Sequence, residues 1–206
     1  MSTIAINMFV SLDGVAQAPG GPKEDVDGDF GHGGWTVPYF TEQVGDIVGP
    51  WHASAGALLL GRRTYDIFAA YWPHVPDGHE EAPMAKILNN VPKYVASRSK
   101  PSLTWENSSL LDGDVPAAVA ELKRQDLGEV VVVGSLDLAQ TLIANDLVDE
   151  YRLTVFPVVL GTGKRLFGDG AVPSGLELVS ARTTDSGVVG CVYRPVGKPG
   201  YGSFEL

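Results

Sequence analysis

Leu58-Leu59-Leu60-Gly61-Arg62-Arg63-Thr64-Tyr65 is the stretch that decides the fold class, because here an apolar strand passes through a glycine into a helix. A helix N-terminus attracts anions through its unpaired N–H groups and its dipole. The guanidinium groups of Arg62 and Arg63 also match the geometry of phosphate. The junction taken alone fits two interpretations equally, a phosphate-binding turn and a solvated arginine pair at a loop.

Strand–helix junctions of this kind recur along the chain. Strands are expected at residues 3–10, 57–60, 94–96, 103–106, 129–133 and 149–156, and helices at residues 35–51, 64–71, 82–89, 115–125 and 136–145. Residues 176–184 and 188–194 are expected to form a β-hairpin. This order predicts an α/β fold with a mainly parallel sheet, helices on both of its faces and an antiparallel edge.

The composition fits one globular domain. The chain has 206 residues, of which 44% are hydrophobic and 19% are charged, so a sizeable core can form. We expect one domain over residues 1–194 and a tail over residues 195–206 that lies outside the core. The net charge of -10 disfavours binding to nucleic acid or to an anionic membrane surface. With no leader and no apolar run of spanning length, the expected location is the cytoplasm.

Metal and disulfide chemistry are not expected. The only cysteine, Cys191, lies in a strand-like sequence and is expected to be buried and inert. The four histidines lack the spacing of metal ligands. Two acidic segments, residues 24–29 and the pair Asp149-Glu150, are expected to be solvated.

Polar and glycine residues follow four of the expected strands. In open α/β sheets, ligands gather beyond the carboxyl ends of the strands. The four segments are Gly61-Arg62-Arg63-Thr64, Ser97-Arg98-Ser99, Gly134-Ser135-Leu136, and Ser11-Leu12-Asp13-Gly14 with the long loop of residues 15–34. Together they favour a dinucleotide that carries several phosphates. Neither the Gly-x-Gly-x-x-Gly fingerprint after a strand nor a Gly-Lys-Ser/Thr P-loop is present.

In this order the motifs resemble the dihydrofolate reductase-like superfamily, in its bacterial branch related to the C-terminal reductase domain of the bifunctional riboflavin biosynthesis protein. The resembling segments are residues 11–14, 59–65, 95–98, 132–135 and 147–167. The resemblance implies a three-layer α/β/α fold with a mixed, mainly parallel central sheet and a C-terminal β-hairpin. It also implies NADPH as reductant, a homodimer, and an activity similar to that of a 5-amino-6-(5-phosphoribosylamino)uracil reductase.

The resemblance also assigns cofactor contacts to the strand ends. The turn at residues 61–64 is assigned the 2′-phosphate and the pyrophosphate, and residues 97–98 are assigned the adenosine. Residues 134–136 are assigned the pyrophosphate turn, and residues 10–17 border the nicotinamide. The residues concerned are Gly61, Arg62, Arg63, Thr64, Ser97, Arg98, Gly134, Ser135, Leu136, Val15 and Ala16.

The expected substrate end departs from the folate pattern. Folate-reducing members carry a carboxylate two residues beyond a proline on the first helix, whereas here Phe40 stands two residues beyond Pro38. Candidates for substrate contact are Trp35, Tyr39, Phe40 and Thr154, with packing or a satisfied strand hydroxyl as their structural alternatives. Candidates for handling a proton are Asp13, Glu42 and the acidic loop.

The sequence therefore predicts an NADPH-dependent reductase that passes hydride to a C=N or C=O bond of a small pteridine- or pyrimidine-like heterocycle. Two alternatives stay open. One is dihydrofolate reductase proper, and the other is a non-catalytic nucleotide- or ligand-binding protein on the same fold.

Overall fold

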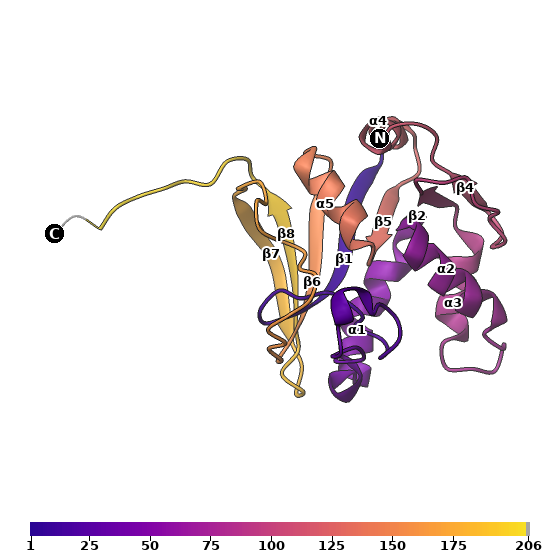
Figure 1. The fold of residues 1–206 in the computed structure, drawn as a ribbon, viewed down its shortest axis with the longest axis horizontal. Coiled ribbons are helices and arrows are strands. Elements are labelled where there is room, and N and C mark those ends of the chain that lie inside the picture. Colours follow the sequence, from indigo (N-terminus) through magenta and orange to yellow (C-terminus); the bar gives the residue numbers. More distant parts are fainter. Residues whose placement is uncertain (205–206) are drawn as a thin grey trace.

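An eight-stranded sheet organises the computed structural model, which describes residues 1–204. The strand order is β4-β3-β2-β5-β1-β6-β8-β7 (Figure 1). All neighbours from β4 to β6 pair in parallel, and β8 pairs antiparallel with both β6 and β7. The strands are β1 Thr3–Ser11, β2 Ala55–Gly61, β3 Lys93–Ala96, β4 Ser108–Leu110, β5 Glu129–Val133, β6 Glu150–Phe156, β7 Leu176–Thr183 and β8 Val189–Pro195.

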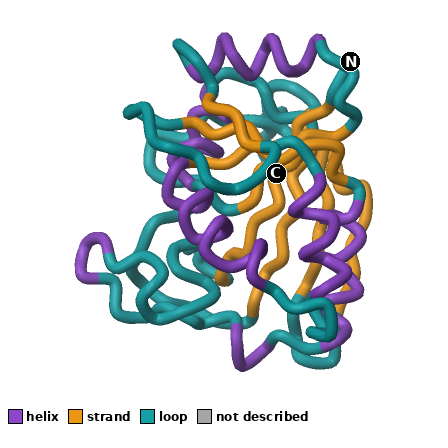
Figure 2. The backbone as a smooth tube through the Cα atoms, turned by 90° about the vertical axis from the view of Figure 1, so that its right-hand side faces the viewer, coloured by secondary structure: helices purple, strands orange, loops and turns teal. Residues whose placement is uncertain are grey.

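Helices cover both faces of this sheet, as Figure 2 shows. One face packs against α4 and α5, and the other against α1, α2 and α3. The α-helices are α1 Glu42–Ala53, α2 Arg62–Tyr71, α3 Ala82–Asn90, α4 Val115–Arg124 and α5 Leu136–Ala144. The predicted three-layer fold with a mainly parallel sheet and a closing hairpin is therefore confirmed.

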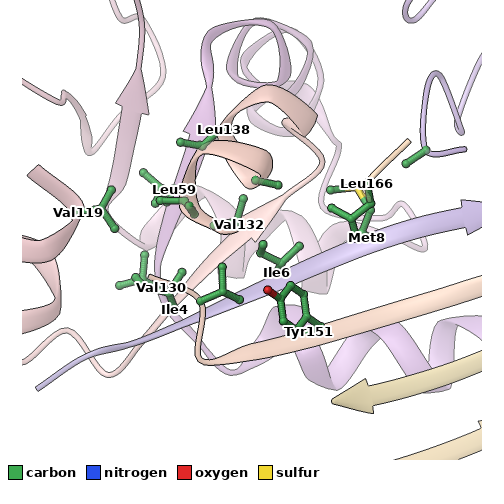
Figure 3. Packing of buried hydrophobic residues seen from close by; sticks show 14 of the residues in the cluster. Ile4, Ile6, Met8, Leu59, Val119, Val130, Val132, Leu138, Tyr151 and Leu166 are labelled. Atoms are coloured by element: carbon green, nitrogen blue, oxygen red, sulfur yellow. The ribbon is translucent and has the colours of Figure 1, made fainter. Parts of the chain in front are cut away.

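The alternation of side chains along the central strands divides the core. Ile4, Ile6 and Met8 of β1 point to the α4/α5 face, where they pack with residues such as Val132 and Leu138 (Figure 3). The intervening residues of β1 therefore point to the α1/α2/α3 face. The two faces of one strand thus serve different layers, and the face under α1 becomes important for the site.

The strand predicted at residues 103–106 is wrong. The strand of this region is β4, five residues later, which pairs with β3. Trp105 is buried, its backbone N–H donates to the Tyr65 hydroxyl at 2.9 Å, and its indole donates to Asn89 Oδ1 at 2.7 Å. Side chains therefore hold this segment in place of a ladder, and the ladder begins only after Asn107, whose φ is 59°.

The helix predicted at residues 35–51 is split. A 3₁₀ turn, Val37–Tyr39, comes first, and α1 begins at Glu42. Phe40 lies between them with extended backbone (φ -78°, ψ 98°). The proline at the start of the turn fits the 3₁₀ geometry, but an extended Phe40 cannot continue it. The aromatic residues at 35–40 thus belong to a loop that leads into α1.

After β8, Val196 and Gly197 still exchange backbone hydrogen bonds with Gly175, and residues 199–204 extend away from the body of the domain (Figure 1). The outermost strand, β7, is exposed along its whole length. Within residues 1–204, none of the helices combines the length and the apolar character needed to cross a membrane.

Candidate functional site

Two of the predicted strand ends meet through Ser135. Its hydroxyl accepts a hydrogen bond from the backbone N–H of Gly61 at 2.8 Å and donates one to Thr64 Oγ1 at 2.8 Å. The end of β2 is thereby joined to the start of α5. Neither α2 nor α5 has a side-chain cap, so the first N–H groups of both helices are available to an anion.

The turn between β5 and α5 adopts left-handed backbone at two successive residues. Gly134 has φ 56° and Ser135 has φ 58°. A Cβ atom at Gly134 would lie 3.5 Å from Thr64 Oγ1, which is ordinary contact, so the conformation rather than space favours glycine. The turn leads directly into the uncapped N-terminus of α5, whose N–H groups attract anions, and this suits the predicted pyrophosphate turn.

Both arginines of the junction are already paired with carboxylates. Arg62, the first residue of α2, contacts Asp66 one turn later at 2.6 Å. Arg63 donates from Nη1 to Asp25 at 2.6 Å and to Asp27 at 2.8 Å. The Arg62 pair is an exposed pair within one helix, which is worth only about 0.3–0.5 kcal/mol and gives way readily to a stronger anion.

The prediction of a solvated acidic loop is wrong for Asp25, whose side chain is 13% exposed, whereas Asp27, at 50%, is solvated as predicted. Both carboxylates also accept from Lys164 Nζ at 2.8 Å, so two acids and two bases form one cluster, here called the acidic latch (Asp25, Asp27, Arg63, Lys164). The hydrogen bonds from Arg63 and Lys164 lower the pKa of Asp27 to about 2. Burial opposes ionisation of Asp25, but Lys164 outweighs it and the pKa of Asp25 is also lowered.

Gln17 fixes the backbone of the acidic latch. Its Nε2 donates to the carbonyls of Asp25 at 3.2 Å and Asp27 at 2.9 Å, and its Oε1 accepts from the Lys164 N–H at 3.0 Å. Beside it lies an open hollow of about 260 Å³, lined by Gln17, Asp27, Gly28, Phe30, Thr162, Gly163 and Lys164. The loop of residues 15–34 is therefore tied across the carboxyl edge of the sheet.

Asp13 serves as an anchor of the turn after β1. Its carboxylate accepts from the Ser11 hydroxyl at 2.7 Å and from the backbone N–H groups of Leu160 at 3.1 Å and Gly161 at 2.8 Å. The hydrogen bond from Ser11 is the largest of the effects that lower its pKa to about 2. A carboxylate held in this way is ionised at neutral pH and accepts hydrogen bonds, which does not suit a proton donor.

The other predicted cofactor residues lie around the same edge. Ala96 pairs with Gly61, so Ser97 and the exposed Arg98 directly follow the strand that neighbours the arginine turn. Val15 and Ala16 are buried, and Val15 forms a β-bridge with Arg165. Leu136 opens α5. All four predicted strand ends thus lie at one edge of the sheet.

An aromatic cluster occupies the α1 side of that edge. Phe156 is fully buried and makes edge contacts with Phe9 at 5.4 Å, Trp35 at 5.5 Å and Tyr39 at 6.5 Å between ring centroids. Trp35 donates its indole N–H to the Gln17 carbonyl at 2.8 Å, so it packs inside the loop. Phe40 rests on Phe9 at 6.0 Å with 47% of its surface exposed, and is the ring of this cluster most open to solvent.

Of the remaining predicted residues, Thr154 is buried in β6 and Glu42 is exposed at the first position of α1. The prediction that Asp149-Glu150 is a solvated turn is wrong. Asp149 accepts from the Ile4 N–H at 2.8 Å and pairs with Lys123 at 2.7 Å. Glu150 pairs with Arg152 at 2.7 Å. These carboxylates fasten β6 to its neighbours.

Two residues near the site were not singled out from the sequence. Lys164 is separated from its latch partners Asp25 and Asp27 by more than a hundred positions, so no local pattern reveals their pairing. Asn7 is the second, a carboxamide on the central strand β1 that is 5% exposed. A polar residue in the run Ile4-Ala5-Ile6-Asn7-Met8-Phe9-Val10 is a signal that could have singled it out.

Known proteins share this fold and this sequence pattern. The model of the family "RibD C-terminal domain" matches residues 2–190. The uncharacterized protein YyaP of Bacillus subtilis (strain 168) is 32% identical over 193 residues, which cover 92% of this chain and 93% of YyaP. The uncharacterized protein YwjB of the same organism is 27% identical over 158 residues, which cover 77% of this chain and 78% of YwjB.

Solved structures agree on the fold. A protein of Shewanella sp. PV-4, named for riboflavin biosynthesis, superposes with a TM-score of 0.70 at 18% identity and covers 94% of this chain and 98% of its own. A pyrimidine reductase-like protein of Corynebacterium diphtheriae gives 0.60 at 13% identity, covering 94% and 92%. A diaminohydroxyphosphoribosylaminopyrimidine deaminase/5-amino-6-(5-phosphoribosylamino)uracil reductase of Thermotoga maritima also gives 0.60, at 15% identity, covering 94% of this chain and 56% of its own.

Proposed function

Because the chain belongs to the RibD C-terminal domain family, within the dihydrofolate reductase-like superfamily, we propose that it is an NADPH-dependent reductase of a small pyrimidine- or pteridine-like heterocycle. The observation that carries this proposal is the bridge by Ser135 Oγ between Gly61 N and Thr64 Oγ1. It brings two uncapped helix starts and two adjacent arginines to one edge of the sheet. That donor set fits a ligand with more than one phosphate.

Different segments of the chain would contact different parts of the cofactor. The N–H groups at the starts of α2 and α5 would hold the pyrophosphate, and Arg62, Arg63 and Thr64 would hold the 2′-phosphate. Ser97 and Arg98 would border the adenosine, and the backbone of Val15 and Ala16 the nicotinamide. When bound, a reduced nicotinamide supplies hydride to a C=N or C=O bond. The protein's part is to orient the two reactants and exclude water.

The substrate would lie on the α1 side, against the aromatic cluster. Phe40 and Tyr39 offer flat faces and edges to a heterocycle, Trp35 supports the cluster from inside the loop, and Thr154 lies in the neighbouring strand β6. The position that bears a carboxylate in folate-reducing relatives is Phe40 here, in extended backbone before the helix. Glu42, one short step along the chain, is the proposed route by which a proton enters from solvent. Asp13 is proposed to position the turn after β1.

We also propose that the protein is a homodimer. Strand β7 is one of the two edges of the sheet, and Leu176, Leu178 and Val179 on it are 38%, 53% and 45% exposed. Long exposed edges with apolar side chains are surfaces that proteins cover by association. Sedimentation of the purified chain should give twice the monomer mass, and a monomeric mass at micromolar concentration would contradict this assignment.

The reductase proposal is tested by following NADPH oxidation with a panel of aminouracils, pteridines and dihydrofolate. We expect turnover with a pyrimidine or pteridine and little with dihydrofolate. Efficient reduction of dihydrofolate would instead establish a folate reductase. Tight binding of NADPH without oxidation on any member of the panel would establish the non-catalytic alternative.

A further inference from the structure

Two neighbouring strands carry buried polar side chains without partners. Within residues 1–204, the buried side-chain nitrogen and oxygen atoms that lack a hydrogen-bond partner are Asn7 Nδ2, Asn7 Oδ1, Thr154 Oγ1 and Ser108 Oγ. Asn7 is 5% exposed and Thr154 is 1% exposed. Ser108 lies on the edge strand β4 at the other side of the sheet. The remaining three atoms therefore come from β1 and β6, which pair with each other.

Asn7 and Thr154 lie on the same face of the sheet. Asn7 pairs with Arg152 and Phe9 pairs with Thr154, so the two polar residues are one alternate position apart on adjoining strands. Ile6 and Met8 of β1 and Leu153 and Val155 of β6 pack on the α4/α5 side. By alternation, Asn7 and Thr154 point to the α1 side, which holds the aromatic cluster.

This pair also adjoins the proposed cofactor turn. The carbonyl of Asn7 accepts a hydrogen bond from the N–H of Gly134 at 3.4 Å. Phe9, two residues on and on the same face, contacts both Phe40 and Phe156. Asn7 therefore lies between the phosphate-binding turn and Phe9 along β1, and Thr154 lies beside Phe9 on β6. We call Asn7 and Thr154 the polar floor.

Burial without partners is costly, and within residues 1–204 Ser108 Oγ is the one further buried side-chain polar atom without a hydrogen-bond partner. Lys93 is fully buried at the start of β3, yet its ammonium donates to the carbonyls of Asn89 at 2.7 Å and Glu106 at 3.0 Å. A buried carboxamide with neither its donor nor its acceptor used is disfavoured relative to an apolar side chain of similar shape. Two such side chains on one face therefore call for a partner, and a bound molecule is one that could supply it.

We infer that Asn7 and Thr154 recognise the cyclic amide edge (–CO–NH–) of the heterocyclic substrate, with Asn7 as the residue that sets specificity. This inference rests on the proposed function, since it names how that substrate is read. A carboxamide presents one donor and one acceptor side by side, which complements a lactam, and the threonine hydroxyl can take either role. Neither group is charged, so the floor favours a neutral ring over a carboxylate or phosphate.

A ligand would reach the polar floor from solvent past Phe40. This residue is the exposed member of the series of edge-to-face contacts Phe40–Phe9–Phe156, and it has extended backbone between a 3₁₀ turn and α1. Displacement of Phe40 and Phe9 by a flat ring would bring the amide edge of that ring to the polar floor. The aromatic rings would then contact the ligand in place of their edge contacts with one another.

The experiment compares two probes that differ only in ring N–H groups, 6-aminouracil and 6-amino-1,3-dimethyluracil, by calorimetric titration of the full chain without cofactor. We expect the wild type to bind 6-aminouracil about tenfold or more tighter than the dimethyl probe. Asn7→Leu should abolish this preference while its melting temperature stays equal or rises, because the variant removes the unpartnered carboxamide. An undiminished preference in Asn7→Leu, or no preference in the wild type, would overturn the inference.

Two further variants keep the test decisive. Thr154→Val is nearly isosteric and should reduce the preference several-fold, which covers the case in which Asn7→Leu does not fold. Ser108→Ala removes the unpartnered hydroxyl of β4 and should leave the preference unchanged. Since no turnover is measured, a lost preference in Asn7→Leu supports the polar floor even if no pyrimidine is reduced. If the protein reduces pyrimidines but Asn7→Leu keeps the preference for 6-aminouracil, the assignment of the polar floor is wrong and the reductase proposal still holds.

Discussion

The two ends of the candidate site handle polar groups in opposite ways. At the cofactor end, Arg62, Arg63 and Ser135 are all engaged by partners within the chain. At the substrate end, Asn7 and Thr154 are buried with no partner. Charged groups at an exposed edge can exchange an internal carboxylate for a phosphate at a small cost in free energy. Buried neutral groups cannot form hydrogen bonds with solvent, so only a bound molecule can supply their partners. The first end is therefore adapted to exchange partners, and the second to receive one kind of ligand edge.

Arg62→Ala should give the largest effect at the cofactor end. It removes a charged partner of the 2′-phosphate, so the dissociation constant for NADPH should rise about 10–100-fold, with little change for NADH. Fluorescence titration with both nucleotides measures the two constants. Arg124→Ala is the matched control, because Arg124 is an exposed helical arginine that pairs with Glu121 away from the site. Equal weakening of both nucleotides by Arg62→Ala would remove Arg62 from the 2′-phosphate site.

Ser135→Ala should weaken the junction itself. The variant leaves the Gly61 N–H without its acceptor and takes a donor from Thr64, which should lower the free energy of unfolding by about 1–2 kcal/mol. Urea denaturation of the cofactor-free protein measures this loss. Ser99→Ala, on an exposed loop at the neighbouring strand end, should stay within about 0.5 kcal/mol of wild type. A stable Ser135→Ala would mean that the two strand ends are held together by packing alone.

The sequence predicts the two ends unequally well, for a physical reason. The strand–glycine–helix junctions are local patterns, so Gly61–Thr64 and Gly134–Ser135 could be placed at one edge once the sheet was inferred to be parallel. The latch joins Asp25 to Lys164, and the polar floor joins Asn7 to Thr154, each through tertiary packing that no local pattern encodes. The helix predicted from residue 35 is split because apolar spacing cannot reveal the extended Phe40.

The double variant Asp25→Asn, Asp27→Asn tests whether these carboxylates compete with the phosphates of NADPH for Arg63. Without the two carboxylates, Arg63 keeps its charge and loses its internal anions, so NADPH should bind about 2–5-fold tighter at low salt, and less so at 0.5 M salt. Titration at two salt concentrations checks this. Asp29→Asn, on the same loop, is the control. Weaker binding in the double variant would show that the latch organises the cofactor site and does not compete for it.

The same latch gives the wild type a defined pH response. The pKa of Asp27 is about 2 in the folded protein, below its ordinary value of 3.8. The latch therefore contributes stability that is fully present above about pH 4 and is lost as the pH falls toward 2. Limited proteolysis of the loop of residues 15–34 should accelerate over that range in wild type. In the double variant the loop should be cleaved rapidly at every pH.

The pH dependence of stability at Lys93 tests what burial does to a polar group that has hydrogen-bond partners. Burial lowers the pKa of Lys93 to about 8, although Glu106 opposes this. The unfolded chain binds more protons than the folded one between pH 8 and 10.5, so the free energy of unfolding rises across that window. The two carbonyls and the Trp105 ring, 4.3 Å from the ammonium, favour the charged form and therefore oppose this rise. Lys93→Met should lack the rise.

Subtracting the two unfolding curves removes the tyrosines, which titrate in both proteins and act in the opposite direction. Burial raises the pKa of Tyr151, for example, to about 12, so this tyrosine lowers the free energy of unfolding as the pH rises above 10. A difference curve that is flat from pH 8 to 10.5 would mean that the partners of Lys93 fully offset its burial. The contrast with Asn7 would then be complete, since one buried polar group would be wholly satisfied by the fold and the other only by a ligand.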